Sequence, residues 1–144
     1  MNQSRNTGKV SAALAKAQAE FGVFVVDKDS YNFSYLTLGK ILDVALPILG
    51  KYNISLIQDS AVEVVGEEPW IKVTTRISCD DEWVESVLSF PMIIPSKKTD
   101  TDIAMLGSTI SYLRRYALQS MLGVAGTDKD VEQLNEETKF KNGE

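Results

Sequence analysis

The stretch GSTISYLRRYALQSMLG, residues 107–123, decides the fold of this chain. Apolar side chains recur in it and just before it at steps of three and four residues, which predicts one amphipathic helix over residues 102–122. Residues 100–102 offer caps, with acids that suit the positive end of the helix dipole. Gly123 can end the helix in the left-handed conformation. The apolar stripe consists of Ile103, Leu106, Ile110, Leu113, Ala117 and Met121.

The opposite face of this helix is polar, with small hydroxyl, aromatic and cationic side chains. On a helical wheel it consists of Ser108, Ser111, Tyr112, Arg115 and Gln119. Such a face on a well-anchored helix suits a phosphate-bearing partner, and an ordinary solvated face is the alternative. Arg115 projects near the centre of the face. Arg114 falls at the edge of the apolar stripe, so we predict a structural or intersubunit role for it, paired with a carboxylate.

The same stretch resembles the signature of the Erf (essential recombination function) family, which are phage-type single-strand annealing proteins. The resemblance is carried by GSTISYLRRYAL at residues 107–118 and by the apolar-glycine-apolar step of residues 122–124. Family members usually have threonine at the position of Ser111 and alanine at that of Leu113. They also commonly have an unbroken acidic run where this chain has TDKD at residues 127–130.

The resemblance covers roughly residues 31–126 and implies both a fold and a function. It implies a homo-oligomer, ring or filament, that binds single-stranded DNA in an outer groove and anneals complementary strands in recombination without nucleotide. The setting would be the cytoplasm of a bacterial host, with a phage or prophage gene. Under this hypothesis Arg115 contacts DNA phosphate, together with the rest of the polar face. A single-strand binding protein is a further candidate partner.

Composition limits the chemistry that the chain can perform. Its 144 residues suit one domain, and its apolar runs are shorter than the ~20 residues that span a bilayer, so no membrane partner is expected. A single cysteine, Cys79, and the absence of histidine exclude an intrachain disulfide, a Cys- or His-based metal site and histidine catalysis. No GxxxxGK[ST] phosphate loop is present. We therefore expect no enzyme activity, no cofactor and no metal.

The net charge of −5 is unevenly distributed along the chain. Residues 127–144 carry six acids and three lysines, whereas residues 1–126 are nearly balanced. A local basic groove therefore remains compatible with the composition. We predict a single-strand annealing domain over residues 1–126 and an acidic, disordered tail over 127–144. The tail would either screen the groove or recruit a partner.

The pattern before the long helix predicts an α+β fold. We expect frayed residues 1–8, then a helix from Val10 that ends near Gly22, and a second helix that Pro47 makes kink or restart near Leu46. Alternating strands then form a three-stranded antiparallel meander, which resembles the core of single-strand annealing recombinases. The expected elements after residue 36 are a helix over 37–50, strands near 54–65, 70–79 and 83–92, and the helix over 102–122.

Further candidate DNA contacts lie outside the long helix. Lys72 and Arg76 share the polar side of the middle strand, about 13 Å apart, and form a basic track or else pair with Glu82 and Glu85. Lys97 and Lys98 lie in the loop before the long helix and either clamp a phosphate backbone or only solubilise the loop. These four side chains are predicted DNA contacts.

Aromatic residues alternate before the second helix. Tyr31, Phe33 and Tyr35 follow the turn-prone segment 27–30 and would share one side of an extended chain. They could stack on bases or pin the helix to the core, and Tyr35 is the candidate for DNA contact. Two other classes of function stay open: a single-stranded DNA-binding module that does not anneal, and an interaction module that contacts a host factor.

Overall fold

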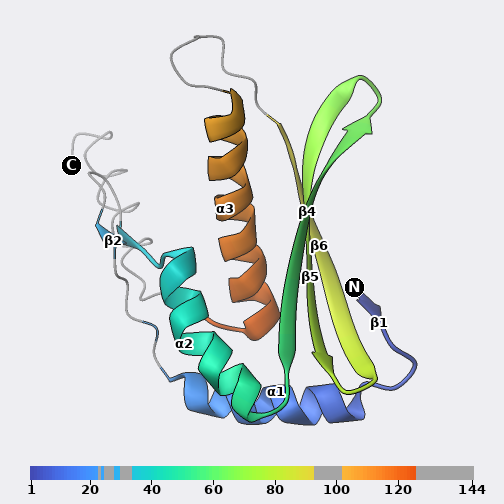
Figure 1. Ribbon diagram of the computed structural model, residues 1–144, viewed down its shortest axis with the longest axis vertical. Helices are drawn as coiled ribbons and strands as arrows, with labels where there is room; N and C mark the ends of the chain where they lie inside the picture. Colours follow the sequence, from blue (N-terminus) through green and yellow to red (C-terminus); the bar gives the residue numbers. More distant parts are fainter. Residues whose placement is uncertain (23, 25–27, 30–33, 93–101, 126–144) are drawn as a thin grey trace, which may run out of the picture.

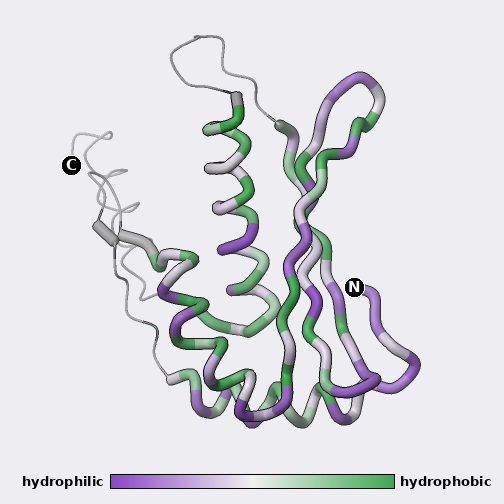
Figure 2. Tube along the Cα trace, in the orientation of Figure 1, coloured by the Kyte–Doolittle hydropathy of each residue, from purple (hydrophilic) through white to green (hydrophobic). Residues whose placement is uncertain are grey.

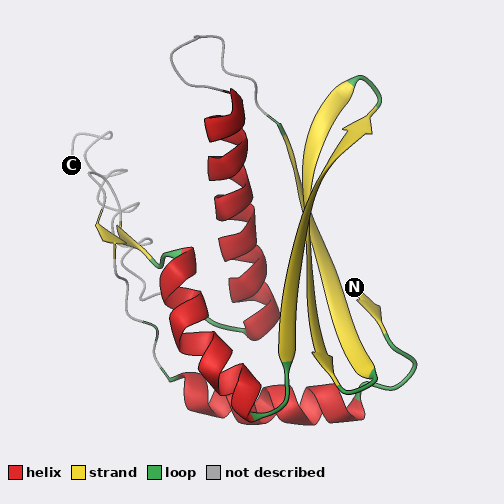
Figure 3. Ribbon diagram, viewed as in Figure 1, coloured by secondary structure: helices red, strands yellow, loops and turns green. Residues whose placement is uncertain are grey.

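The computed structural model describes residues 1–22, 24, 28–29, 34–92 and 102–125 (Figure 1). Helices pack against an antiparallel sheet in two layers (Figure 3). The predicted α+β fold, with a helix, a meander and a long helix in that order, is confirmed. The elements are β1 Asn2–Gln3, α1 Gly8–Phe21, β2 Lys28–Asp29, β3 Ser34–Tyr35, α2 Leu38–Lys51, β4 Ser55–Val65, β5 Glu68–Cys79, β6 Glu82–Pro91 and α3 Asp102–Leu122.

The main sheet has the strand order β1-β6-β5-β4, with every pair antiparallel. Two-residue turns connect its long strands, and the predicted turn at Asp80–Asp81 is confirmed. The alternation predicted for β5 is also confirmed, because the side chains on its inner face are completely buried. That inner face consists of Ile71, Val73, Thr75 and Ile77. The only polar member, Thr75, accepts a hydrogen bond from Gln58 at 2.9 Å.

Residues 2–4 form hydrogen bonds with the edge of β6, contrary to the expectation that residues 1–8 fray. Asn2–Gln3 pairs with Val84 and Glu85 as β1. Ser4 continues the contact, because its backbone N–H donates to the carbonyl of Trp83 and its hydroxyl accepts from the backbone N–H of that residue. Two residues with ordinary composition carry no strand signal of their own, so the sequence pattern could not reveal this pairing.

The start of α1 is capped by a residue far away in the sequence. Thr7 at the N-cap makes no side-chain capping bond, and the first turn holds no acid. Instead, Glu82 Oε2 accepts from the backbone N–H groups of Lys9 at 2.6 Å and Val10 at 3.1 Å. A carboxylate here satisfies two unpaired donors and lies at the positive end of the helix dipole. Glu82 is therefore not a partner of Lys72 or Arg76.

Helix α2 begins at the predicted place and passes through its proline. The side chain of Thr37 accepts from the backbone N–H of Lys40 at 3.2 Å, which caps the first turn. A kink or a restart is predicted near Leu46, and the restart is wrong, since the helix is continuous over residues 38–51. Buried side chains on both sides of the proline, at Ala45 and Leu49, pack into the core and hold the helix together.

Helix α3 spans the predicted residues and ends before Gly123, whose φ of +67° confirms the left-handed end. Its apolar stripe is covered unevenly. Leu113, Ala117 and Met121 are buried, whereas Ile103, in the first turn, is 77% exposed. Two clusters form the core: a large one between α1, α2, the end of α3 and the base of the sheet, and a small one between the middle of α3 and β5.

The segment between α1 and α2 is described only in part. Phe24 is buried and meets Phe21 edge-to-face, with ring centroids 5.9 Å apart. Lys28–Asp29 pairs with Ser34–Tyr35, so these two residues form a strand where the sequence predicts a turn. Tyr31, Phe33, Lys97, Lys98 and the predicted tail lie outside the described residues. For Tyr35 only the backbone is described. Within the described residues no helix combines the length and the apolar composition needed to cross a bilayer.

Candidate nucleic-acid interface

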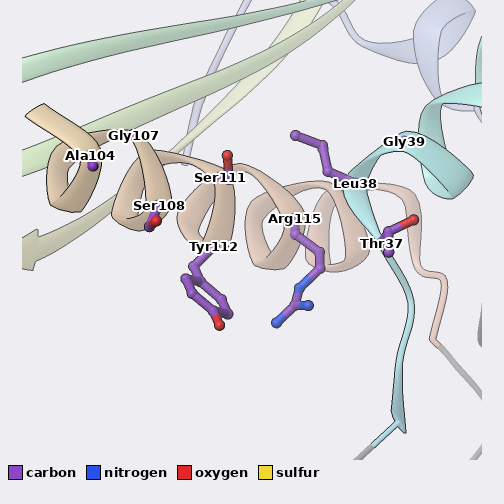
Figure 4. A pocket seen from close by; sticks show the side chains of 9 residues that line it. All are labelled: Thr37, Leu38, Gly39, Ala104, Gly107, Ser108, Ser111, Tyr112 and Arg115. Atoms are coloured by element: carbon purple, nitrogen blue, oxygen red, sulfur yellow. The ribbon is translucent and has the colours of Figure 1, made fainter. Parts of the chain in front are cut away.

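A groove of about 640 Å³ lies between α3 and the start of α2 (Figure 4). Four predicted contact residues line it, which brings together Ser108, Ser111, Tyr112 and Arg115. The remaining lining residues are Thr37, Leu38, Gly39, Ala104 and Gly107. None of these lining residues is acidic. The sequence pattern places the α3 residues on one face, whereas the contribution from α2 depends on tertiary structure and is not predicted.

Arg115 is buried, with only 6% of its surface exposed, although the helical wheel places it near the centre of the polar face. Its guanidinium carbon lies 5.0 Å from the ring centre of Tyr112 and 4.9 Å from that of Tyr116. Its Nη2 also donates to Tyr116 Oη at 3.2 Å. Both rings are about half exposed. The cation is thus held between two aromatic faces, which fixes its position at the wall of the groove.

The positive end of α2 reinforces this charge. Leu38 and Gly39 are the first residues of the helix, and both line the groove. The first N–H groups of a helix and its dipole favour an anion at that end. The sequence has no acid in the first turn of α2 to neutralise it. The start of α2 and the Arg115 guanidinium therefore give the same groove a positive electrostatic character.

Arg114 points in another direction and connects α3 to the sheet. Its Nε donates to Gln58 Oε1 at 3.1 Å, and Gln58 Nε2 donates back to the carbonyl of Arg114 at 3.1 Å. The same amide bonds Thr75 on β5. From the sequence, the expected partner of Arg114 is a carboxylate. In the structure the amide of Gln58 takes that place, because it can both accept from the guanidinium and donate to the helix carbonyl.

A second, apolar groove of about 450 Å³ adjoins the first. It lies between α3 and β6, and Tyr112 lines both grooves. Its other lining residues are Leu88, Ser89, Phe90, Thr109, Leu113 and Tyr116. Tyr116 is not among the contacts predicted from the sequence, although its spacing of four residues from Tyr112 places both rings on one side of the helix.

Lys72 and Arg76 lie on the outer face of the sheet, opposite the buried inner side chains of β5. Lys72 Nζ lies 2.9 Å from Glu63 Oε1, and Arg76 Nη2 lies 2.7 Å from Glu85 Oε2. The Arg76 guanidinium also lies over the ring of Trp83, with 4.1 Å between the guanidinium carbon and the ring centre. Within one chain these two bases do not join the groove at Arg115, because α3 packs on the inner face of β5.

The other predicted contact on α3, Gln119, is half-buried and does not line either groove. Its backbone carbonyl accepts from the N–H of Val124 at 3.1 Å at the end of the helix. In the described part of the chain, no group of three acidic or cysteine side chains could hold a metal ion. The only cysteine, Cys79, is buried.

The fold and the groove define an α+β module with a positive, aromatic-lined surface, and sequence comparison places it in a family. The profile of the ERF superfamily matches residues 10–143. Because the match spans most of the chain, this protein belongs to the ERF superfamily. Membership supports a general role in recombination and strand annealing. No curated protein and no solved structure matches the chain.

Proposed function

We propose that this chain binds single-stranded DNA and promotes annealing of complementary strands without nucleotide hydrolysis, as a homo-oligomer. The observation that carries the proposal is the groove that Arg115, held between Tyr112 and Tyr116, lines together with the start of α2. Annealing requires no covalent step. We therefore also propose that the chain is not an enzyme and that it acts without a cofactor, in the cytoplasm of a bacterial host.

The positive groove suits the sugar-phosphate backbone of the strand. The exposed hydroxyls of Ser108 and Ser111 can donate to phosphate oxygens, and Arg115 supplies the charge. Because Arg115 is held between two rings, little side-chain entropy is lost when it meets a phosphate. Contacts of this kind are independent of sequence, which an annealing protein requires because it must accept any strand.

The adjoining apolar groove suits the bases. Tyr112, Tyr116 and Phe90 are each about half exposed along it. Stacking of a base on an aromatic side chain contributes about 1–3 kcal/mol and tolerates every base. Tyr112 belongs to both grooves, so a strand bound there would place its phosphates towards α2 and some of its bases towards β6.

Binding of a labelled oligonucleotide, measured by fluorescence anisotropy at low and high salt, tests the proposal. Ser108→Glu and Ser111→Glu place a negative charge in the groove at exposed positions, so the fold should tolerate them. Each should weaken binding at least tenfold at low salt and reduce annealing of complementary strands. Ser120→Glu is the matched control, because Ser120 is exposed on the same helix but does not line the groove.

Two results would contradict the proposal. One is a wild-type chain that neither binds nor anneals in the absence of nucleotide. The other is equal binding by Ser108→Glu, Ser111→Glu and Ser120→Glu. The salt dependence adds a separate measure, since log K should fall with log salt by about 0.7 for each phosphate neutralised on a single strand.

A further inference from the structure

We propose that β4 is the contact strand of a twofold dimer, in which the β4 strands of two copies pair antiparallel. The two four-stranded sheets would then form one continuous sheet. The proposal specifies the surface used for the self-association that forms part of the proposed function. Its test measures dimerisation without DNA, so the two can fail separately.

The first observation is the open edge of β4 (Figure 1). Among the described residues β4 pairs only with β5, so one side of an 11-residue strand presents its backbone donors and acceptors outwards. Monomeric proteins usually protect such an edge with lysine, proline, a bulge or a covering element. The sequence SLIQDSAVEVV contains no lysine, arginine, proline or glycine. Every residue from Asp59 to Val65 is exposed, so no other described segment covers them.

The opposite edge of the sheet, at β6, is partly covered, and this favours a second β4 as the partner of β4. There β1 covers Val84 and Glu85, and Ser4 bonds Trp83. The strand ends at Pro91, which cannot donate a hydrogen bond. Within the part of the chain that the structure describes, residues 86–90 of β6 stay open on that side. In a head-to-tail contact between β4 of one copy and β6 of another, the first residues of β4 would meet β1, which already occupies that part of the edge. A second β4 is the partner that offers an edge of equal length.

The side chains of β4 are compatible with this pairing. If Ser60 lies on the twofold axis, Leu56 faces Val64 of the second copy and Gln58 faces Val62. The two acids, Asp59 and Glu63, then face Ala61 and Ile57, so no like charges lie directly opposite. The contact would also cover apolar side chains that are exposed in the single chain, which are Ile57, Val62, Val64 and Val65.

The symmetry places both candidate DNA grooves on one side of the dimer. Antiparallel pairing of identical strands requires a twofold axis perpendicular to the sheet. Such an axis keeps the two α3 helices on the same face of the joined sheet. A single strand could therefore pass from one groove to the other without crossing the sheet.

Cysteine crosslinking distinguishes the twofold arrangement from others, because only residues near a twofold axis meet their own copies. Ser60→Cys, Ala61→Cys and Val62→Cys are oxidised without DNA and analysed on non-reducing gels. At least one should give a disulfide-linked dimer in high yield, since paired residues lie within disulfide reach. Ser55→Cys is the matched control, an exposed serine on the same strand that would face Val65. Native Cys79 is buried. Yields no higher than that of Ser55→Cys at all three positions would overturn the proposal.

A second measurement examines the dimer itself. Sedimentation of the wild-type chain should show a species of twice the chain mass or a multiple of it. The double substitution Val62→Lys and Val64→Lys changes exposed positions and protects the edge with charge. It should shift the dimer to the monomer and leave the thermal melt within a few degrees of wild type. Val87→Lys, an exposed position on β6, is the control and should stay dimeric. A monomeric wild type, or a lysine pair with unchanged mass, would contradict the proposal.

Discussion

The base of the molecule and its open end differ in how completely their apolar side chains are covered. At the base, α1, α2 and the end of α3 meet the sheet around side chains such as Leu118, Leu122 and Ile77, which are fully buried. At the open end, apolar side chains of α3 and of the β4–β5 hairpin stay in solvent, and Val64 is 71% exposed. Hydrophobic residues thus continue beyond the packed core (Figure 2).

The buried residues at the base stabilise the fold, whereas the exposed apolar residues at the open end are available for contact with a partner. Burial of apolar surface stabilises the fold by about 25 cal/mol per Å², so the base supplies most of the free energy of folding. The exposed valines contribute little to it, and they are free to contact a partner. The candidate DNA groove lies between these regions, where α3 passes the start of α2.

The largest expected effect is the loss of a core side chain at the base. Leu118→Ala removes a completely buried side chain and should lower the free energy of unfolding by about 2–5 kcal/mol. Ile103→Ala on the same helix should change it by no more than about 0.5 kcal/mol, because that residue is mostly exposed. Urea denaturation followed by circular dichroism measures both. Similar losses for the two variants would refute the contrast.

A smaller loss of stability is expected from removal of the buried carboxylate of Glu82, at the start of β6. Glu82→Ala leaves the backbone donors of Lys9 and Val10 without their acceptor, which should cost about 1–3 kcal/mol of unfolding free energy. The neighbouring Asp81→Ala removes only an ion pair with Lys9 at 3.5 Å, and the side chain of Asp81 is 85% exposed. Such a pair contributes about 0–1 kcal/mol. Equal thermal melts for the two variants would argue against the capping role of Glu82.

Much of the fold could be predicted from the chain because its local signals agree. The alternation of β5 and the turn at Asp80–Asp81 define the hairpin, and the stripe from Leu106 to Met121 defines α3. The burial of Arg115 could not be predicted in this way. A helical wheel assigns one covered side to a helix, whereas the end of α3 is covered on two, by the sheet and by α2.

The candidate site was likewise predicted in part. Positions on one helix, such as Ser108 and Tyr112, share a face because of helical spacing alone. Whether Lys72 and Arg76 join them depends on which face of the sheet packs on α3, and alternation does not show that. The caps and clamps between distant segments, such as Glu82 on α1, involve single residues without a periodic pattern, so only the tertiary structure identifies them.

The clamp between α3 and the sheet should contribute about 1 kcal/mol. Arg114→Ala and Gln58→Ala each remove one half of a reciprocal pair, and the double variant measures their coupling energy. A second double-mutant cycle on the exposed ion pair of Lys72 and Glu63 is the control and should give a smaller coupling energy. Thermal or urea unfolding of the wild type and the six variants gives both values. Coupling near zero for the first pair would mean that Arg114 is not a structural clamp.

The smallest expected effect concerns the exposed contact between α1 and the end of α2. Glu20 Oε1 accepts from Lys51 Nζ at 2.6 Å and from the hydroxyl of Tyr52. The hydrogen bond from Lys51, followed by that from Tyr52, lowers the pKa of the Glu20 carboxyl below its ordinary value. A carboxyl with a lowered folded-state pKa stabilises the fold above its unfolded pKa of about 4.3, and this contribution is lost as the pH falls through the folded pKa.

Glu20→Gln should therefore be less stable than wild type near neutral pH, and the two stability curves should converge as the pH falls below about 4. The difference should be small and should decrease with added salt, because the group is exposed and screened. Urea midpoints from pH 7 to pH 3, at two salt concentrations, measure it. Glu67→Gln, in the exposed turn of the β4–β5 hairpin, controls for the loss of one negative charge. A difference between Glu20→Gln and wild type that stays constant from pH 7 to pH 3 would show that the carboxylate contact does not cause it.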